Sequence, residues 1–244
     1  MRQGFNVTQY EAACRKRTRV SSLIIFILIP ATIAAGCIFL DNERYMVVSL
    51  ALLVYTMVPF FMVFEKRKPK AREIVLIAMM AAITVCAQLF FHMVLPLQIG
   101  TALIIISGIA LGPEAGFLIG ATARFICNFY MGQGPWTPWQ MFAMGIIGWL
   151  AGVLYRKGVL RRGRLSLCIF GVIASTIIYG GIMNPASALM WSNTVNWKII
   201  LSYYVTGIPV DLVRAVATFI FLWLGAEPML EKLDRIKVKY GLAC

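Results

Sequence analysis

Long apolar runs dominate this sequence and restrict the folds that it can adopt. Eight segments are nearly free of charge, at about 21–40, 46–64, 74–92, 99–112, 114–130, 138–155, 165–190 and 199–225. A helix that crosses a bilayer needs about 20 mostly apolar residues. The alternation of polar and apolar residues that is typical of a β-barrel is missing from these runs. The sequence therefore predicts an all-α membrane protein with eight transmembrane helices.

The composition agrees with a membrane protein. Hydrophobic residues make up 60% of the 244 positions and charged residues only 14%, whereas a soluble domain has about 25% charged residues. These polar side chains are too few to cover a soluble surface, which excludes a soluble enzyme and a disordered tail. The net charge of +13 would suit a nucleic-acid-binding protein, so the positions of the charges decide what they mean.

The basic residues lie almost entirely on one predicted side of the membrane. Nineteen of the 23 lysines and arginines fall in the segments 1–20, 66–72, 156–164 and 232–239. Eight spans place these four segments on the same side, and cytoplasmic loops of membrane proteins carry the excess of basic residues. We therefore expect both termini in the cytoplasm and no nucleic-acid partner.

The fourth and fifth runs are short, and Gly112 and Pro113 separate them. A Gly-Pro pair ends one helix and starts the next, since proline is tolerated in the first turn of a helix. The sequence therefore favours two helices over one broken helix, while a re-entrant pair remains the alternative.

The predicted outer side has few charges and many aromatic and amide side chains. Flat rings provide apolar contact and amides provide directional hydrogen bonds, so a neutral or weakly charged organic ligand is expected there. The alternative for any single tryptophan is an aromatic belt at the lipid headgroups. The candidate ligand-binding residues are His92, Gln98, Asn128, Gln133, Trp136, Trp139, Gln140, Asn184, Trp191 and Asn193.

Three ionisable residues, Arg124, Asp211 and Arg214, lie inside predicted spans, where a charge is costly. Asp211 and Arg214 are three positions apart on one helix face, so they can pair. The pair either holds helices together or takes part in ligand binding or a conformational switch. Asn184 and Pro185 are expected to interrupt the seventh span and to expose carbonyl groups.

Residues for catalysis or metal binding are missing from the sequence. The chain has one histidine, and its six cysteines do not pair at metal-ligand spacing. It has no glycine-rich phosphate loop followed by lysine. We therefore expect a protein that is not an enzyme, with no cofactor and no metal, whose energy comes from a partner or an ion gradient.

Small residues recur four positions apart, a spacing that lets helices approach closely. The pairs are Ala78 and Ala82, Gly108 and Gly112, Gly116 and Gly120, and Gly148 and Gly152. Packing within the chain is the first expectation for each pair, and contact with a partner protein is the alternative.

Three segments resemble the substrate-binding S components of energy-coupling factor (ECF) transporters. They are 72–82, similar to the first core helix, 111–117, similar to the turn between the second and third helices, and 132–141. The last, GQGPWTPWQM, is the most specific and is similar to the subgroup that includes the cobalamin S component. The resemblance implies a six-helix core over 73–230. A two-helix extension in 1–72 would precede the core and a basic cytoplasmic tail in 231–244 would follow it.

The resemblance also implies a mechanism. An S component captures a vitamin at the outer face of the bacterial plasma membrane and docks on a transmembrane coupling subunit that carries two cytoplasmic ATPase subunits. It then topples to deliver the ligand inward. An Ala-x-x-x-Ala pattern on the first core helix contacts the coupling subunit in this family, and Ala78 and Ala82 match it.

Cobalamin is the ligand that the resemblance favours, with riboflavin or another heterocycle as the alternative. An ion-coupled secondary transporter that uses Arg124, Asp211 and Arg214 is the competing class. A membrane-embedded enzyme or an assembly factor is a third class, and the missing catalytic residues disfavour the enzyme.

Overall fold

The computed structural model describes residues 22–39, 71–94, 98–192 and 196–240, together with 47–48, 50–52 and 54–55. Every regular element in this part of the chain is helical, as predicted. The elements are η1 (Ile24–Leu28), α2 (Ile29–Phe39), α4 (Ala71–Val94), α5 (Gly100–Leu111), α6 (Pro113–Met131), α7 (Trp136–Arg156), α8 (Arg164–Ile173), η2 (Ala174–Tyr179), α9 (Gly180–Trp191) and α10 (Trp197–Lys239). The predicted N-terminal cytoplasmic segment and most of the second predicted span lie outside the described residues.

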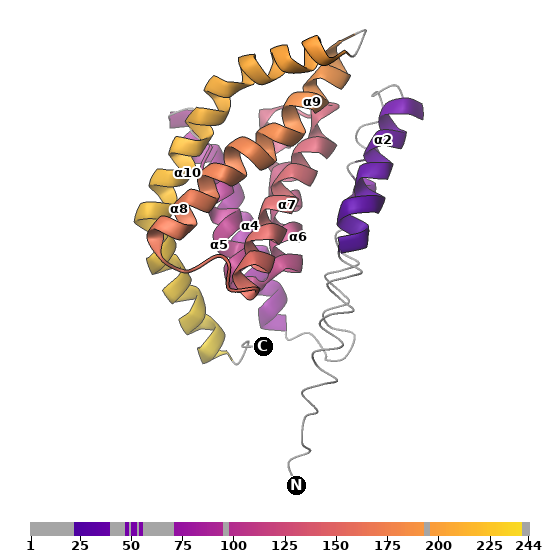
Figure 1. The fold of residues 1–244 in the computed structure, drawn as a ribbon. Coiled ribbons are helices and arrows are strands. Elements are labelled where there is room, and N and C mark those ends of the chain that lie inside the picture. The colour runs from indigo at the N-terminus through magenta and orange to yellow at the C-terminus, as the bar shows by residue number, and fades with distance from the viewer. Residues whose placement is uncertain are drawn as a thin grey trace.

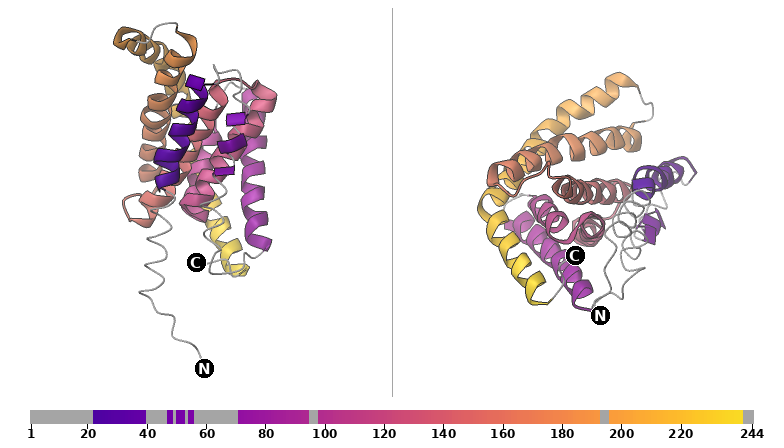
Figure 2. Two further views of the ribbon diagram at one scale, coloured as in Figure 1. Left: turned by 90° about the vertical axis from the view of Figure 1, so that its right-hand side faces the viewer. Right: turned by 60° about the horizontal axis from the view of Figure 1, so that its bottom comes forward.

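The helices from α4 onward form one bundle in which successive helices run in opposite directions, with α8, η2 and α9 acting as one continuous rod (Figure 1). We call the top of this view the upper end. It holds the C-terminus of α4, the turn between α6 and α7, and the connection from α9 to α10. The lower end holds the turn between α5 and α6 and the end of α10. Two further views show α10 covering one side of the bundle (Figure 2).

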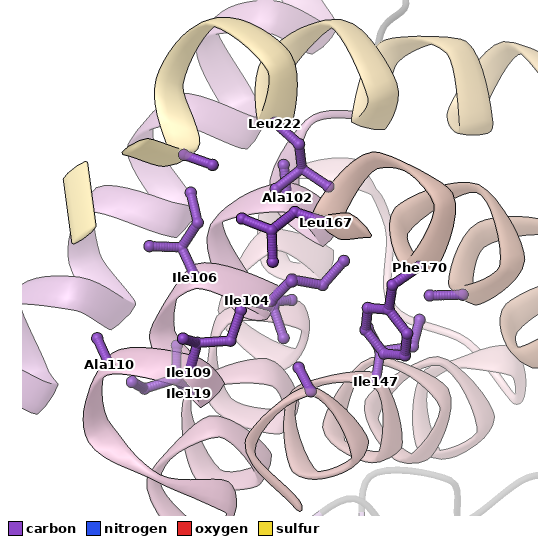
Figure 3. Packing of buried hydrophobic residues seen from close by; sticks show 14 of the residues in the cluster. Ala102, Ile104, Ile106, Ile109, Ala110, Ile119, Ile147, Leu167, Phe170 and Leu222 are labelled. Atoms are coloured by element: carbon purple, nitrogen blue, oxygen red, sulfur yellow. The ribbon is translucent and has the colours of Figure 1, made fainter. Parts of the chain in front are cut away.

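Helix α5 forms the centre of the bundle. Every residue from Gly100 to Ala110 is buried, and the helix is apolar all round, as is typical of a helix enclosed by others. Its Ile104, Ile106 and Ile109 contact apolar side chains of the surrounding helices, among them Ile147 of α7 and Leu222 of α10 (Figure 3). These side chains make up the main core.

Glycines allow α5, α6 and α7 to touch through their backbones. A Cβ atom on Gly108 would lie 2.1 Å from the carbonyl oxygen of Gly148, and one on Gly116 would lie 2.6 Å from the same oxygen. A Cβ on Gly152 would lie 2.6 Å from the nitrogen of Pro113. Packing within the chain is thus confirmed for these glycines.

Gly112 adopts φ +98°, a backbone conformation that side chains disfavour, and α6 starts at Pro113. The fourth and fifth runs are therefore two helices in a hairpin rather than one broken helix. At 12 residues, α5 is about 18 Å long, shorter than the hydrocarbon core of a bilayer, which is about 30 Å.

Four helical stretches in the described part are long and apolar enough to cross a membrane: α4, α7, the rod Arg164–Trp191, and α10. The outer face of α10 is apolar as well, with Leu212, Val216, Ile220 and Leu224 exposed at a spacing of four. Water does not favour so extended an apolar face, whereas lipid does. The count of eight crossings stays a prediction.

Helix α10 is longer than expected. The predicted span ended at 225, but the helix continues to Lys239, into the segment expected as a tail. Buried Leu230 and Leu233 hold this extra length on the core. The Nζ of Lys237 donates to the carbonyl oxygen of Ala110 at 2.7 Å, at the C-terminal end of α5.

Pro185 does not interrupt the seventh span, contrary to the prediction, because it lies inside α9 and the helix continues to Trp191. A proline lacks the N–H that would bind the carbonyl four residues earlier. That carbonyl, of Gly181, instead accepts a hydrogen bond from the hydroxyl of Tyr204 at 3.3 Å. The neighbouring helix thus satisfies the carbonyl that the proline frees.

The N-terminal helices pack on the outer face of α6 and α7 (Figure 2). Ile25 and Ile29 are buried against Phe117 of α6 and Trp149 of α7, in a second apolar cluster. The ring of Phe26 meets Trp149 edge to face at 5.4 Å. The described part of the N-terminal segment is therefore joined to the bundle by side-chain packing.

Candidate functional site

A hydrogen-bond network joins α6 to α7 at the upper end of the bundle. The Nδ2 of Asn128 donates to the Oγ1 of Thr137 at 3.1 Å and to the Oε1 of Gln140 at 2.9 Å. The Nε of Arg124 donates to the same oxygen of Gln140 at 2.8 Å. Thr137 in turn donates to the Oε1 of Gln133 at 2.9 Å. Three predicted site residues, Asn128, Gln133 and Gln140, are thus brought together.

The irregular backbone between α6 and α7 is shorter than expected. The apolar runs of the sequence left 131–137 between two helices, but α6 ends at Met131 and α7 starts at Trp136, so only 132–135 form the turn. Pro135 is the N-cap residue, and Pro138 lies in the first turn of α7. The missing N–H of a proline costs little there, because the first turn of a helix leaves its N–H groups unpaired in any case.

Two predicted tryptophans from different connections meet at the upper end. The rings of Trp136 and Trp191 are stacked, with centroids 6.1 Å apart and an interplanar angle of 27°. Trp136 starts α7 and Trp191 ends α9. The stack places an aromatic surface, with Trp191 largely exposed, next to the turn that carries Gln133.

A second polar cluster joins α9, α10 and the segment before α5. Arg214 donates to the Oδ1 of Asp211 at 2.8 Å, which confirms the predicted pair, and to the Oε1 of Gln98 at 2.7 Å. Asn184 donates to the other oxygen of Asp211 at 3.2 Å. The guanidinium of Arg214 lies 3.7 Å from the centre of the Tyr179 ring. Two more predicted site residues, Gln98 and Asn184, therefore lie on one buried ion pair.

Several buried polar atoms in the upper half have no hydrogen-bond partner. They include the Nε2 of Gln88, the Nδ1 of His92, the Oδ1 of Asn128 and the Nε1 of Trp139. Most buried polar groups in proteins are paired, so each exception needs an explanation. A polar ligand that reaches these atoms would supply such partners.

The remaining predicted residues are not joined to either cluster. Trp139 is partly buried and packs against the second apolar cluster, which contains Phe117 and Trp149. His92 is half-buried near the end of α4 and has no described partner at its Nδ1. Asn193 lies outside the described residues. Ala78 and Ala82 are both exposed on one face of α4.

Sequence reasoning missed two residues that complete the clusters. Thr137 lies in the motif that the sequence singled out, and its hydroxyl accepts from both Asn128 and the backbone N–H of Gly134. No sequence pattern points to Tyr179, because its role depends on the ring lying under Arg214. Within the described residues, no group of three or more histidines, cysteines or acidic residues is placed to hold a metal ion.

A comparison with known protein families identifies the family of this chain. The sequence model of one family, described as the ECF-type riboflavin transporter S component, matches residues 68–226, a range that starts just before α4 and ends within α10. No curated protein and no solved structure matches the chain. The match covers more than half of the chain. The chain therefore belongs to the ECF-type riboflavin transporter S component family, whose members are membrane-embedded substrate-binding subunits of transporters rather than enzymes.

Proposed function

We propose that this chain captures a vitamin with a flat heterocyclic ring at its upper end and delivers it across the bacterial plasma membrane as part of an ATP-driven ECF importer. The family description supports riboflavin as the first ligand to test. Cobalamin is the second candidate, supported by the resemblance of 132–141 to the cobalamin subgroup.

One observation supports the proposed location of the binding site. The stacked rings of Trp136 and Trp191 lie beside the network of Asn128, Gln133 and Gln140. Rings that offer apolar contact next to amides that offer directed hydrogen bonds are the usual lining of a site for a small organic molecule. Helices α6, α7 and α9 and the turn between α6 and α7 supply these groups.

The distribution of charge supports the orientation of the chain. Arg156, Arg162 and Arg164 lie at the lower end, where Arg164 pairs with Glu227 at 2.7 Å and Arg162 pairs with Asp234. Basic residues favour the cytoplasmic side. We infer that the lower end and both termini face the cytoplasm, that the chain crosses the membrane eight times, and that the upper end faces outward.

The exposed face of α4 is the proposed contact with the coupling subunit. Ala78 and Ala82 are exposed there. The glycine pairs, in contrast, lie in contacts between α5, α6 and α7 within the chain. Small residues let a partner helix approach closely. The coupling subunit would carry two ATPase subunits, and their ATP hydrolysis would drive the toppling of this chain.

Transport in proteoliposomes tests the proposal. The full chain is reconstituted with and without the coupling subunit and the two ATPases, and uptake of labelled riboflavin and labelled cobalamin is followed with and without ATP. We expect uptake only from the complete complex with ATP, and for riboflavin. Uptake of cobalamin and not of riboflavin would replace riboflavin as the ligand, while the chain would remain a subunit of an ECF importer. Uptake by the chain alone that an ionophore abolishes would instead establish a secondary transporter.

A further inference from the structure

Arg124 is a buried cation with only neutral partners. Its residue surface is 8% exposed, and it donates to the Oε1 of Gln140 at 2.8 Å and to the Sδ of Met131 at 3.9 Å. A thioether is a weak acceptor. Among the described residues no carboxylate pairs with Arg124, whereas Arg214 has Asp211. A buried charge without such compensation is costly, especially inside a membrane protein.

In the hydrogen bonds next to Arg124, the chemistry of the guanidinium fixes which atoms donate and which accept. A guanidinium can only donate, so Gln140 must present its Oε1 to the Nε of Arg124. Asn128 must then present its Nδ2 to that same oxygen, which it does at 2.9 Å. The Oδ1 of Asn128 is left fully buried and without a hydrogen-bond partner, in a residue that is only 1% exposed.

Arg124 and Asn128 thus offer a hydrogen-bond donor and a hydrogen-bond acceptor from one face of α6. Arg124 and Asn128 are four positions apart, so their side chains lie one helical turn from each other. Arg124 has donor capacity left over, because its two hydrogen bonds use Nε and Nη1 and not Nη2, and Asn128 has an unused acceptor. A ligand that fits both must carry an acceptor next to a donor.

We propose that Arg124 and Asn128 together recognise the imide edge of the ligand's heterocycle. A ring carbonyl would accept from Arg124, and the adjacent ring N–H would donate to the Oδ1 of Asn128. The pyrimidine ring of a flavin has such an edge, with N3–H between two carbonyls. This inference rests on the proposed function and deepens it, because it names the part of the ligand that is recognised and gives Arg124 the role of a ligand-binding residue.

A pair of matched flavins tests the inference. The purified full chain in detergent is titrated with riboflavin and with 3-methylriboflavin, which lacks the N3–H donor, and binding is measured by quenching of flavin fluorescence. We expect the wild-type chain to prefer riboflavin by about 10-fold or more, since the methylated ligand leaves a buried acceptor unpaired. Asn128→Ala should lose this preference. Arg124→Gln should weaken both flavins by a similar factor of about 10 or more, because both keep the carbonyl.

A control variant and the ligand pair together separate the outcomes. Ser175→Ala removes a buried hydroxyl that contacts Thr218 at 3.2 Å, and the preference for riboflavin should survive it. Equal affinity of the wild-type chain for the two flavins would overturn the inference while leaving riboflavin as the ligand. If the wild-type chain does not bind riboflavin, both the inference and riboflavin as the ligand are wrong. If Asn128→Ala fails to fold in a thermal melt, the wild-type preference and the Arg124→Gln variant still decide the question.

Discussion

The Nε of Arg214 donates to the Oε1 of Gln98 across 2.7 Å, although the two residues are 116 positions apart in the sequence. The contact ties the last helix to the segment that leads into the central helix α5. The same guanidinium binds Asp211 and lies over the ring of Tyr179. Four side chains from three parts of the chain therefore hold the upper end together around one buried cation.

Replacing Gln98 by alanine should destabilise this part of the upper end, because Arg214 loses one of its partners. Gln98→Ala leaves one donor of a buried guanidinium without its partner, and a hydrogen bond to a charged group is worth about 1.5–3 kcal/mol. We expect a lower midpoint of thermal unfolding in detergent and weaker ligand binding. Thr176→Ala is the control, since its hydroxyl bonds only to Val172 within its own helix. A Gln98→Ala variant as stable as this control would show that the contact adds nothing.

The stacked tryptophans should act as a unit in ligand binding. Trp136→Ala and Trp191→Ala should each weaken binding by about 10-fold or more, as is common for aromatic residues at the centre of a binding site. Because the two rings contact each other, the double variant should lose less than the sum of the two single losses, with a coupling of about 0.5–1.5 kcal/mol. Isothermal titration of the three variants measures this coupling.

Trp223→Ala is the matched control for the stack. Trp223 also stacks on a neighbour, Phe219, at 5.9 Å and 10°, but on the apolar face of α10 away from the proposed site. Its removal should leave ligand affinity unchanged. Equal losses at Trp223 and Trp136 would mean that the tryptophans serve stability and not recognition.

The sequence predicted the helices well because their signals are local. The boundaries of α4, α6 and α7 fall within a few residues of the apolar runs, and Gly112 with Pro113 marked the turn between α5 and α6. The end of α10 was missed, because the residues after 225 are charged. The helix after 225 depends on the contacts that buried Leu230 and Leu233 make with core residues far away in the sequence.

The glycine contacts between helices predict a steep response to one added methyl group. Gly108→Ala should destabilise the chain by about 1–3 kcal/mol or more, because its Cβ would meet the carbonyl of Gly148 and a packed backbone cannot yield cheaply. Gly225→Ala should instead stabilise it by roughly 0.5–1 kcal/mol, since the nearest atom, on Phe221, is 4.0 Å away and alanine favours a helix. Thermal unfolding in detergent compares the two, and a similar effect of both changes would contradict the packing.

The exposed alanines of α4 predict a change in assembly without a change in ligand binding. Ala78→Trp or Ala82→Trp should abolish co-purification of the coupling subunit and the ATPases, because a bulky ring prevents close approach of a partner helix. The same variants should bind the ligand as the wild-type chain does, since both positions are on the surface. Val216→Trp, on the exposed face of α10, is the control and should assemble normally. An intact complex with Ala78→Trp and Ala82→Trp would place the partner elsewhere.

The candidate site was predictable in its members but not in its connections. Gln133, Trp136 and Gln140 stand in one conspicuous motif, and Asn128 lies one turn beyond Arg124. That Gln98 and Asn184 would meet the same ion pair depends on the packing of α9 and α10, which no local pattern contains. Trp139, which was also predicted for the site, packs on the second apolar cluster, and its part in ligand binding stays a prediction.

The proposed ligand, a flat heterocyclic vitamin held at the upper end of this S component, can be identified on the purified protein. The full chain is purified from cells grown in rich medium, and the small molecule that comes with it is identified by mass spectrometry, for the wild-type chain and for Trp136→Ala. We expect riboflavin in the wild-type sample and a strongly reduced amount in the variant. A corrinoid would replace riboflavin as the ligand. A retained molecule without an aromatic heterocycle, equally abundant in both samples, would contradict the proposed site and ligand class.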